Sequence, residues 1–231
     1  MPNDIIDNRS QKLIEVLNNI FPASQTAKIA VGYFFLSGLD AVADSLFNIQ
    51  EIRLLIGNTT NTETIEQIME GNQRLQEGQD YLEKLIHPKN SEAESWAKDT
   101  AAAIGGVASA MAQSDQNQKM ISNLARVISE GKLKVRLYTR GRLHAKAYIF
   151  DYGKSFDATG RPLPRDQKGV AVVGSSNFTL SGLTHNSELN VRVYGDQNHQ
   201  ALTEWFDRLW EDSQDFEPQL STELKESWAL S

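Results

Sequence analysis

The chain has 231 residues, of which 23 are basic and 30 acidic, so its formal net charge at neutral pH is −7. A chain of this length can form a core without disulfides or metals. It contains no cysteine, which excludes disulfide scaffolds, thiolate metal sites and cysteine nucleophiles. The N-terminus lacks the features of a signal peptide, and no stretch is long and apolar enough to span a membrane. We therefore expect a cytoplasmic protein without membrane contact.

Positive charge is concentrated in one part of the sequence. Residues 131–150 contain six basic residues and no acid: Lys132, Lys134, Arg136, Arg140, Arg142 and Lys146. An anionic ligand is the simplest reason for such a concentration in an acidic protein. A solvated basic strand face is the alternative explanation.

The N-terminal part of the sequence predicts two helices and two strands in alternation. Apolar residues at spacings of three and four predict an amphipathic helix over 10–20. The apolar run 27–36 is typical of a buried strand, and 51–57 predicts the next strand, with a helix over 37–48 between the two. A strand–helix–strand unit favours parallel pairing of its strands.

The rest of the chain predicts helices followed by several strands. Residues 62–130 are almost all helix formers, which we interpret as a helical insertion, and polar–apolar alternation over 132–138 predicts a strand with one wet face. Further strands are expected over 143–150, 169–174 and 188–194, with a hairpin excursion over 152–168 and a last helix over 199–212. The elements predict one α/β domain over 1–231, built on a mixed, largely parallel β-sheet flanked by helices.

Polar residues interrupt the apolar strands at three places. His144 and Lys146 are two residues apart in a strand, so their side chains lie on one face and can meet one ligand. The sequence Gly-Ser-Ser-Asn at 174–177 follows a buried strand, where α/β sheets bind ligands and polar side chains suit phosphate oxygens. Glu188 enters an apolar strand, where a carboxylate needs a partner such as an imidazole N–H. Alone, each has an ordinary explanation: a surface pair, a turn or a strand-edge acid.

Together, the three places resemble the motif of the phospholipase D superfamily. That motif is His-x-Lys-x4-Asp, followed by Gly-Ser-x-Asn and by an acid eleven residues after the asparagine, and the spacing here is the same. The matching residues are His144, Lys146 and Asp151, then Gly174, Ser175 and Asn177, then Glu188. A looser resemblance extends to residues 32–38, which look like the phospholipase D-like module at the front of helicases and restriction-type nucleases.

The resemblance implies a phospholipase D/nuclease-like sandwich and a metal-independent phosphodiesterase that needs no cofactor. One copy of His144 would attack phosphorus to give a phosphohistidine, and a second copy would serve as general acid and base. Lys146, Asn177 and Ser175 would hold the non-bridging oxygens. Glu188 would orient the ring of His144.

Two features depart from the family pattern. The family's site uses two such motifs, whereas this chain contains one, so we expect a homodimer in which two copies of His144 face each other. Asp151 and Gly174 are separated by 22 residues, more than in the compact bacterial nucleases of the family. The hairpin in this excess could shield the site, contact substrate or mediate dimerisation. Asp151 lies five residues beyond Lys146, hence on the other strand face, which favours a structural role.

The motif does not distinguish lipid from nucleic acid substrates. The basic residues would extend a positive track well beyond one phosphate, which favours a polymer, with DNA preferred. The expected contacts to nucleic acid are Lys134, Arg136, Arg140, Arg142 and Ser176. We therefore expect a DNA endonuclease, associated by analogy with a helicase. A DNA-binding or scaffolding module with little activity, and a lipid phosphodiesterase, remain as alternatives.

Overall fold

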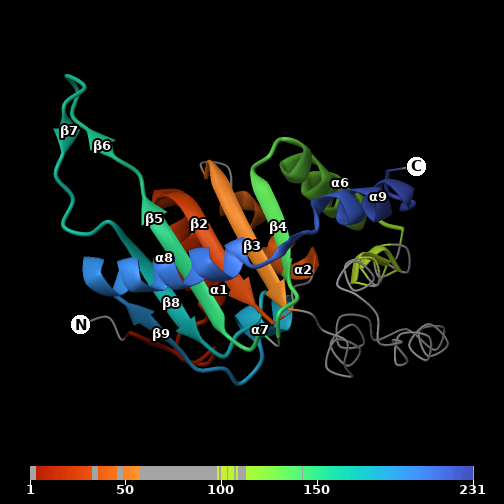
Figure 1. The fold of residues 1–231 in the computed structure, drawn as a ribbon, viewed down its shortest axis with the longest axis horizontal. Coiled ribbons are helices and arrows are strands. Elements are labelled where there is room, and N and C mark those ends of the chain that lie inside the picture. Colours follow the sequence, from red (N-terminus) through yellow and green to blue (C-terminus); the bar gives the residue numbers. More distant parts are fainter. Residues whose placement is uncertain are drawn as a thin grey trace.

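The strands form one eight-stranded mixed sheet and a small separate ribbon (Figure 1). This computed structural model describes residues 4–32, 36–45, 49–57, 98, 100–102, 104–106, 108, 113–141 and 143–230. In the order of their places in the sheet, the strands are β1 (Ile5–Ile6), β9 (Asn190–Val193), β8 (Gly169–Gly174), β5 (Lys146–Tyr152), β2 (Ser24–Val31), β3 (Glu51–Gly57), β4 (Leu133–Tyr138) and β10 (Gln214–Asp215).

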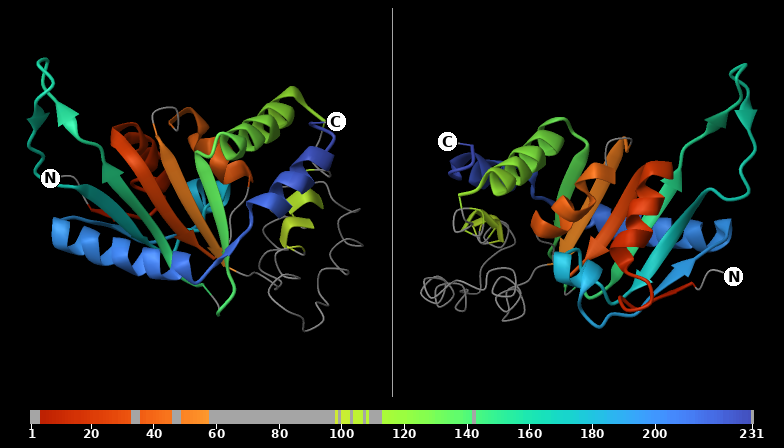
Figure 2. Two further views of the ribbon diagram at one scale, coloured as in Figure 1. Left: turned by 45° about the horizontal axis from the view of Figure 1, so that its top comes forward. Right: turned by 180° about the vertical axis from the view of Figure 1, so that it is seen from behind.

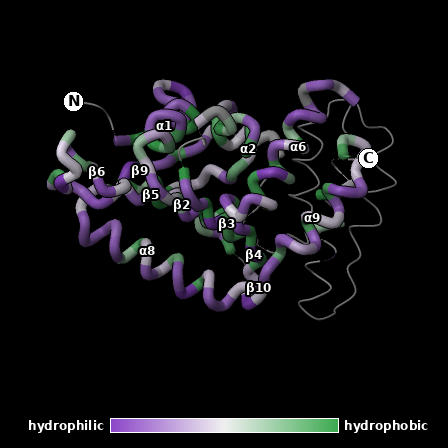
Figure 3. Tube along the Cα trace, turned by 90° about the horizontal axis from the view of Figure 1, so that it is seen from above, coloured by the Kyte–Doolittle hydropathy of each residue, from purple (hydrophilic) through white to green (hydrophobic). Residues whose placement is uncertain are grey.

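Helices cover both faces of the sheet, and Figure 3 shows the two helical layers with the strands between them. One face packs against α1 (Leu13–Ile20), α2 (Leu36–Val42), α6 (Asp115–Ser129), α7 (Leu180–Thr184) and α9 (Glu217–Glu226). The other face packs against α8 (Asp196–Glu211). Short 3-10 turns, η1 (Phe21–Ala23) and η2 (Ala43–Ser45), follow α1 and α2. No helix within the described ranges has the length and apolarity needed to cross a membrane.

Two apolar cores follow from the alternation of side chains along each strand. Tyr148 and Phe150 of β5 belong to the larger core, where Phe150 meets Phe21 edge-to-face with ring centroids 5.0 Å apart. Ile149, between them, faces the smaller core and Phe206 of α8. Since successive side chains of a strand point to opposite faces, Lys146 belongs to the face of Tyr148. Asp151 belongs to the face of Ile149.

The sheet is mixed as predicted, but its parallel part is smaller than we expected. β2 pairs in parallel with β3, and β3 with β4, which confirms the strand–helix–strand unit. β5 pairs antiparallel with both β2 and β8, and β8 pairs antiparallel with β9. The description "largely parallel" therefore holds only for β2, β3 and β4. Hairpin-type connections, such as the one between β5 and β8, join antiparallel neighbours.

The predicted hairpin is present and projects from the body of the protein (Figures 1 and 2). Its strands, β6 (Ser155–Phe156) and β7 (Pro162–Leu163), pair antiparallel with each other. Lys146 pairs with Gly174 at one end of the β5–β8 ladder, and Asp151 with Gly169 at the other. The hairpin leaves from this second end. It therefore does not shield the motif of its own chain, which corrects one of the three roles considered for it.

The structure describes only part of the helical insertion. Residues 62–97 lie outside the described residues, so the prediction for them stays a prediction. Helix α6 confirms the helical part at 115–129, and the side-chain hydroxyl of Ser114 caps it by accepting a hydrogen bond from the backbone nitrogen of Asn117 at 3.3 Å.

Candidate active site

The motif residues meet at one edge of the sheet. Strands β2, β3 and β4 run in parallel toward this edge, while β5 begins and β8 ends there. In an α/β sheet the carboxyl ends of parallel strands leave a crevice in which ligands bind. The edge therefore has the position expected of a binding site.

His144 and Lys146 lie at the start of β5. The side chain of His144 is exposed, in the segment just before the strand. Lys146 is the first residue of β5, and its Nζ donates a hydrogen bond to the backbone oxygen of His144 at 2.9 Å. This bond folds the lysine back over the segment, so its ammonium lies beside the backbone of His144.

Asn177 is held against the end of β2. Its Oδ1 accepts a hydrogen bond from the backbone nitrogen of Gly32 at 3.0 Å, and the residue is buried. A Cβ on Gly32 would lie 3.2 Å from this Oδ1, 3.3 Å from the backbone oxygen of Leu143 and 3.9 Å from Nζ of Lys146. Gly32 is thus the point where the end of β2, the start of β5 and the Asn177 loop converge. The bond from Gly32 to Oδ1 thus fixes the orientation of the Asn177 amide at this edge of the sheet.

Ser175 and Glu188 form a pair of their own. The hydroxyl of Ser175 donates a hydrogen bond to the carboxylate of Glu188 and accepts one from the backbone nitrogen of Leu189 at 3.0 Å. Among the described residues, which include both partners, no hydrogen bond or ion pair joins Glu188 to the ring of His144. The carboxylate expected to orient the histidine therefore has a serine as its partner within one chain.

The comparisons with known proteins agree with this geometry. The family profile described as "Cardiolipin synthase, PLD-like domain" matches residues 16–210, a span that contains every residue of the motif. The chain belongs to the phospholipase D-like family. This membership makes it a phosphodiesterase of the phospholipase D superfamily and confirms the resemblance that the motif indicated. The comparison with curated protein sequences gave no match.

Several solved structures resemble the phospholipase D-like chain. Phosphatidylserine synthase from Haemophilus influenzae shares 14% identity at a TM-score of 0.52, over 98% of this chain and 43% of that one. Nuc, a phospholipase D family member from Salmonella typhimurium, shares 11% identity at a TM-score of 0.47, over 91% of this chain and 95% of that one. NucT from Helicobacter pylori shares 13% identity at a TM-score of 0.44, over 93% and 99%. The likeness to the synthase shows a shared fold and nothing finer.

Ser176 does not line the site, which corrects our expectation for it. The residue has no exposed surface, and its hydroxyl accepts a hydrogen bond from Nδ2 of Asn190 at 2.9 Å. Its backbone oxygen accepts another from the Tyr148 hydroxyl at 2.9 Å. Ser176 therefore fastens the loop of the phospholipase D-like motif to β9 and β5, and it cannot reach a phosphate.

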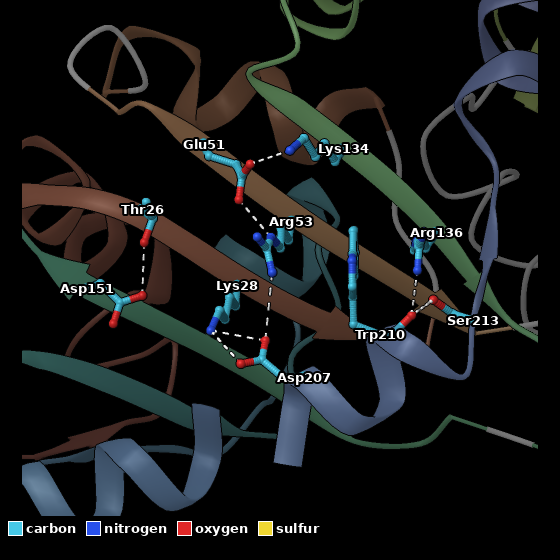
Figure 4. Close-up of polar contacts among 10 residues, drawn as sticks. All are labelled: Thr26, Lys28, Glu51, Arg53, Lys134, Arg136, Asp151, Asp207, Trp210 and Ser213. Atoms are coloured by element: carbon cyan, nitrogen blue, oxygen red, sulfur yellow. Dashed lines mark hydrogen bonds and ion pairs between the residues drawn. The ribbon is translucent and has the colours of Figure 1, made fainter. Parts of the chain in front are cut away.

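Asp151 lies on the sheet face opposite Lys146, as strand alternation predicts. Its Oδ2 accepts a hydrogen bond from the Thr26 hydroxyl at 2.9 Å, and its Oδ1 lies 3.4 Å from Nε2 of His199. His199 is buried in α8 and also lies 3.0 Å from the backbone oxygen of Phe150. The motif aspartate thus ties β5 to β2 and α8, a structural contact away from His144. Figure 4 shows its bond to Thr26.

The basic residues of β4 are neutralised by acids from other segments. Lys134 pairs with Glu51 (Figure 4), and Nε of Arg136 lies 2.8 Å from Asp215. Burial raises the pKa of Glu51, but hydrogen bonds from Lys134 and Arg53 lower it more, so its pKa lies below the usual value and the carboxylate stays charged. β4 is also three strands away from β5, about 14 Å at normal strand spacing.

The remaining cations of the predicted track lie in the loop that follows β4. Arg140 pairs with Asp212 at 3.0 Å. Arg142 lies outside the described residues. The structure thus brings Lys146, Asn177 and Gly32 together beside His144, while it places Lys134 and Arg136 elsewhere on the sheet.

A cavity of about 360 Å³ lies on the α8 face, among the residues Arg53, Lys134, Arg136, Trp210, Asp215, Glu217 and Pro218. The guanidinium groups of Arg53 and Arg136 lie 5.8 and 5.1 Å from the centre of the Trp210 ring. Glu51 pairs with Arg53 and Lys134, and Asp215 pairs with Arg136, so we interpret this region as a structural ion-pair network. Within the described part of the chain, no group of three or more acidic or histidine side chains is arranged to hold a metal ion.

Proposed function

We propose that the protein hydrolyses phosphodiester bonds in nucleic acid, with DNA preferred, without a metal and through a phosphohistidine at His144. The observation that carries the proposal is the meeting of Lys146, Asn177 and Gly32 beside the exposed His144. An ammonium and an amide donor placed beside a nucleophile suit a phosphate with two non-bridging oxygens.

The proposed chemistry runs in two steps. A neutral ring of His144 attacks phosphorus, and a P–N bond forms while the bond to the leaving oxygen breaks. The His144 of a second copy gives its proton to that oxygen. The same ring then takes a proton from water, whose oxygen attacks phosphorus and breaks the P–N bond. Lys146 and Asn177 donate hydrogen bonds to the non-bridging oxygens throughout.

We propose that two copies of the chain complete the site. One chain carries one copy of the motif, whereas the two steps need two histidines with different roles. Because Glu188 is hydrogen-bonded to Ser175, another group must orient the ring of His144. Leu189, beside Glu188, exposes 63% of its surface, and a second copy packed there would cover it.

Nucleic acid is the proposed substrate class because the cations nearest the motif belong to an exposed loop. Arg140 pairs with Asp212 on the surface, and such pairs contribute only about 0–1 kcal/mol. A phosphate of the substrate can therefore replace the carboxylate. A polymer can place one phosphate at Arg140 and, at the same time, the reacting phosphate at Lys146. The association with a helicase stays a prediction.

The test is cleavage of labelled single-stranded and duplex DNA in excess EDTA by the intact protein and by the variant His144→Ala. His185→Ala is the matched control, because His185 is also exposed and lies outside the motif. We expect cleavage by the intact protein and the control, and at least about a thousandfold loss in His144→Ala.

Two other assays accompany the cleavage test. The first measures release of the head group from choline-lipid vesicles. A rate of lipid hydrolysis above the rate of DNA cleavage would show that the substrate is a lipid and not nucleic acid. Sedimentation should give a dimer. DNA cleavage that is equal in His144→Ala and the intact protein would overturn the proposed mechanism.

A further inference from the structure

The hairpin 153–168, which we call the β6–β7 arm, is firmly anchored at its base. The backbone nitrogen of Tyr152 donates to the oxygen of Lys168 at 2.8 Å, and the nitrogen of Lys168 donates to Asp196 of α8 at 2.8 Å. The guanidinium of Arg165 lies 5.4 Å from the centre of the Tyr152 ring. The arm leaves the body from this base (Figure 2). Its orientation is therefore set by the sheet and by α8.

The tip of the arm is a closed turn. Oδ1 of Asp157 accepts hydrogen bonds from the backbone nitrogens of Thr159 at 2.8 Å and Arg161 at 2.9 Å, and Gly160 takes a positive φ of 80°. Hydrogen bonds from the Thr159 hydroxyl and the Arg161 backbone lower the pKa of Asp157. The carboxylate is thus committed to the turn, and the tip is ordered before any partner arrives.

Positive charge is available on the arm. It carries four cations and two acids, within a chain whose net charge is −7. Over the described ranges, which include the whole arm, no ion pair involves the cations of the arm: Lys154, Arg161, Arg165 and Lys168. By contrast, Lys134 and Arg136 of β4 are both paired with acids. The arm, rather than β4, offers cations to an anionic partner.

The arm also exposes apolar side chains but resists strand pairing. Phe156 and Leu163 expose 55% and 48% of their surface. Pro162 and Pro164, on either side of Leu163, have no N–H to donate to a neighbouring strand. Proline at a sheet edge blocks the addition of another strand. A second copy or a protein strand is therefore a poor fit to β7.

We infer that the β6–β7 arm is a second contact for duplex nucleic acid, remote from the reacting phosphodiester. The major groove of B-DNA admits a two-stranded β-ribbon, and apolar side chains such as Phe contact thymine methyl groups there. Lys154 and Arg161 would pair with phosphates at the rim of the groove. The choice of nucleic acid as partner rests on the proposed function.

The distance between the arm and the motif sets a length requirement. Lys146 and Tyr152 are the ends of β5, and their separation of about 20 Å at normal strand rise corresponds to about six base pairs of duplex. A substrate must exceed this length to meet both His144 and the arm. A small phosphodiester can meet only His144.

The experiment compares Lys154→Gln/Arg161→Gln with the control Lys119→Gln/Lys225→Gln, which removes the same charge from exposed positions on α6 and α9. Both pairs are placed in the His144→Ala background, and binding of a duplex of about 30 base pairs is measured by fluorescence anisotropy over a salt series. Hydrolysis of bis(p-nitrophenyl) phosphate is measured with His144 intact. Circular dichroism melting checks that the variants fold.

We expect the arm variant to bind the duplex about tenfold more weakly than the control and to lower the slope of log affinity against log salt by about two. Hydrolysis of the small ester should be equal in the two variants. Equal duplex binding by arm variant and control would overturn the inference. Arm-dependent binding to phosphatidylglycerol vesicles, or a changed oligomeric state without a change in duplex binding, would overturn it as well.

The two proposals fail in different ways. An arm-dependent salt slope in a protein that hydrolyses neither the small ester nor DNA would overturn the proposed function and support the arm. Hydrolysis that depends on His144, together with equal duplex affinity in the arm variant and the control, would support the proposed function and overturn the inference.

Discussion

The side-chain oxygen of Asn177 accepts a hydrogen bond from the backbone nitrogen of Gly32 at 3.0 Å, across 145 residues of sequence. The bond fixes the orientation of the Asn177 amide, because Oδ1 is turned toward the end of β2. It also makes position 32 tight for a side chain, because a Cβ there would lie 3.2 Å from Oδ1 and 3.3 Å from the backbone oxygen of Leu143, and these neighbours would have to shift by a few tenths of an ångström. The alignment of the site therefore depends on a glycine outside the motif.

Gly32→Ala should lower the rate of phosphodiester hydrolysis about tenfold, because a shift of a few tenths of an ångström in Asn177 misaligns its donor. The substitution should leave the protein folded. The matched control is Gly141→Ala, where a Cβ would meet only Tyr138, at 4.0 Å. Turnover of bis(p-nitrophenyl) phosphate at saturating concentration measures the effect. Equal turnover in the two variants would contradict the positioning role of Gly32.

The spacing of the motif predicted which segments meet, but not every side chain that faces the ligand. His144 and Lys146 belong to one strand start and Asn177 to the neighbouring strand end, so pairing of β5 with β8 brings them together. Ser175 occupies the serine position of the motif and Ser176 its variable position, and strand pairing does not tell whether the variable residue also faces the ligand. Only the hydrogen bonds to Asn190 reveal that Ser176 is buried. The contribution of Gly32 comes from tertiary contacts, although a glycine at the end of a buried strand is the signal that could have found it.

Long-range charge pairing was the other property hidden from the sequence. The acids that neutralise Lys134, Arg136 and Arg140 come from β3, β10 and the end of α8, so a local count of charge overstates the positive track. Apolar runs predicted β2 and β3, and periodicity predicted β4 and α8, because each of these elements is long enough to show its pattern. Strands β1 and β10 have two residues each and carry no pattern. They form because the longer strands β9 and β4 have unpaired edges with which β1 and β10 can pair.

Asn190→Ala should destabilise the fold by about 1–3 kcal/mol, because it leaves the buried hydroxyl and backbone nitrogen of Ser176 without their partner. Unfolding in urea measures this cost. Ser176→Ala in the same chain removes the hydroxyl, which is one of the two groups that Asn190→Ala leaves without a partner. The free energy of unfolding of the double variant should therefore fall by less than the sum of the decreases in the two single variants. Strict additivity would show that the two side chains do not interact.

Asp212→Asn should strengthen duplex binding about two- to threefold at low salt, because it frees Arg140 from its surface ion pair. The gain should disappear at high salt, where the attraction to phosphates is screened. Asp215→Asn is the control of equal charge, since it removes the acid that pairs with Arg136 on the α8 face instead, where Arg136 is still bonded to the backbone oxygen of Trp210. The same gain in both variants would show that net charge, and not Arg140, is responsible.

Stability in acid should depend on Asp7, in the turn that precedes α1. Backbone hydrogen bonds from Arg9 and Ser10 and one from the Ser10 hydroxyl lower its pKa from 3.8 to about 2. Since the folded state has the lower pKa, protonation favours unfolding: the stabilisation is complete above the unfolded pKa and is lost as the pH falls through that range toward 2. Asp7→Asn removes this titration, so the difference in urea midpoint between the two proteins should narrow as the pH falls from 5 to 2. A difference that stays constant over this range would show that the turn does not stabilise the charged form of Asp7.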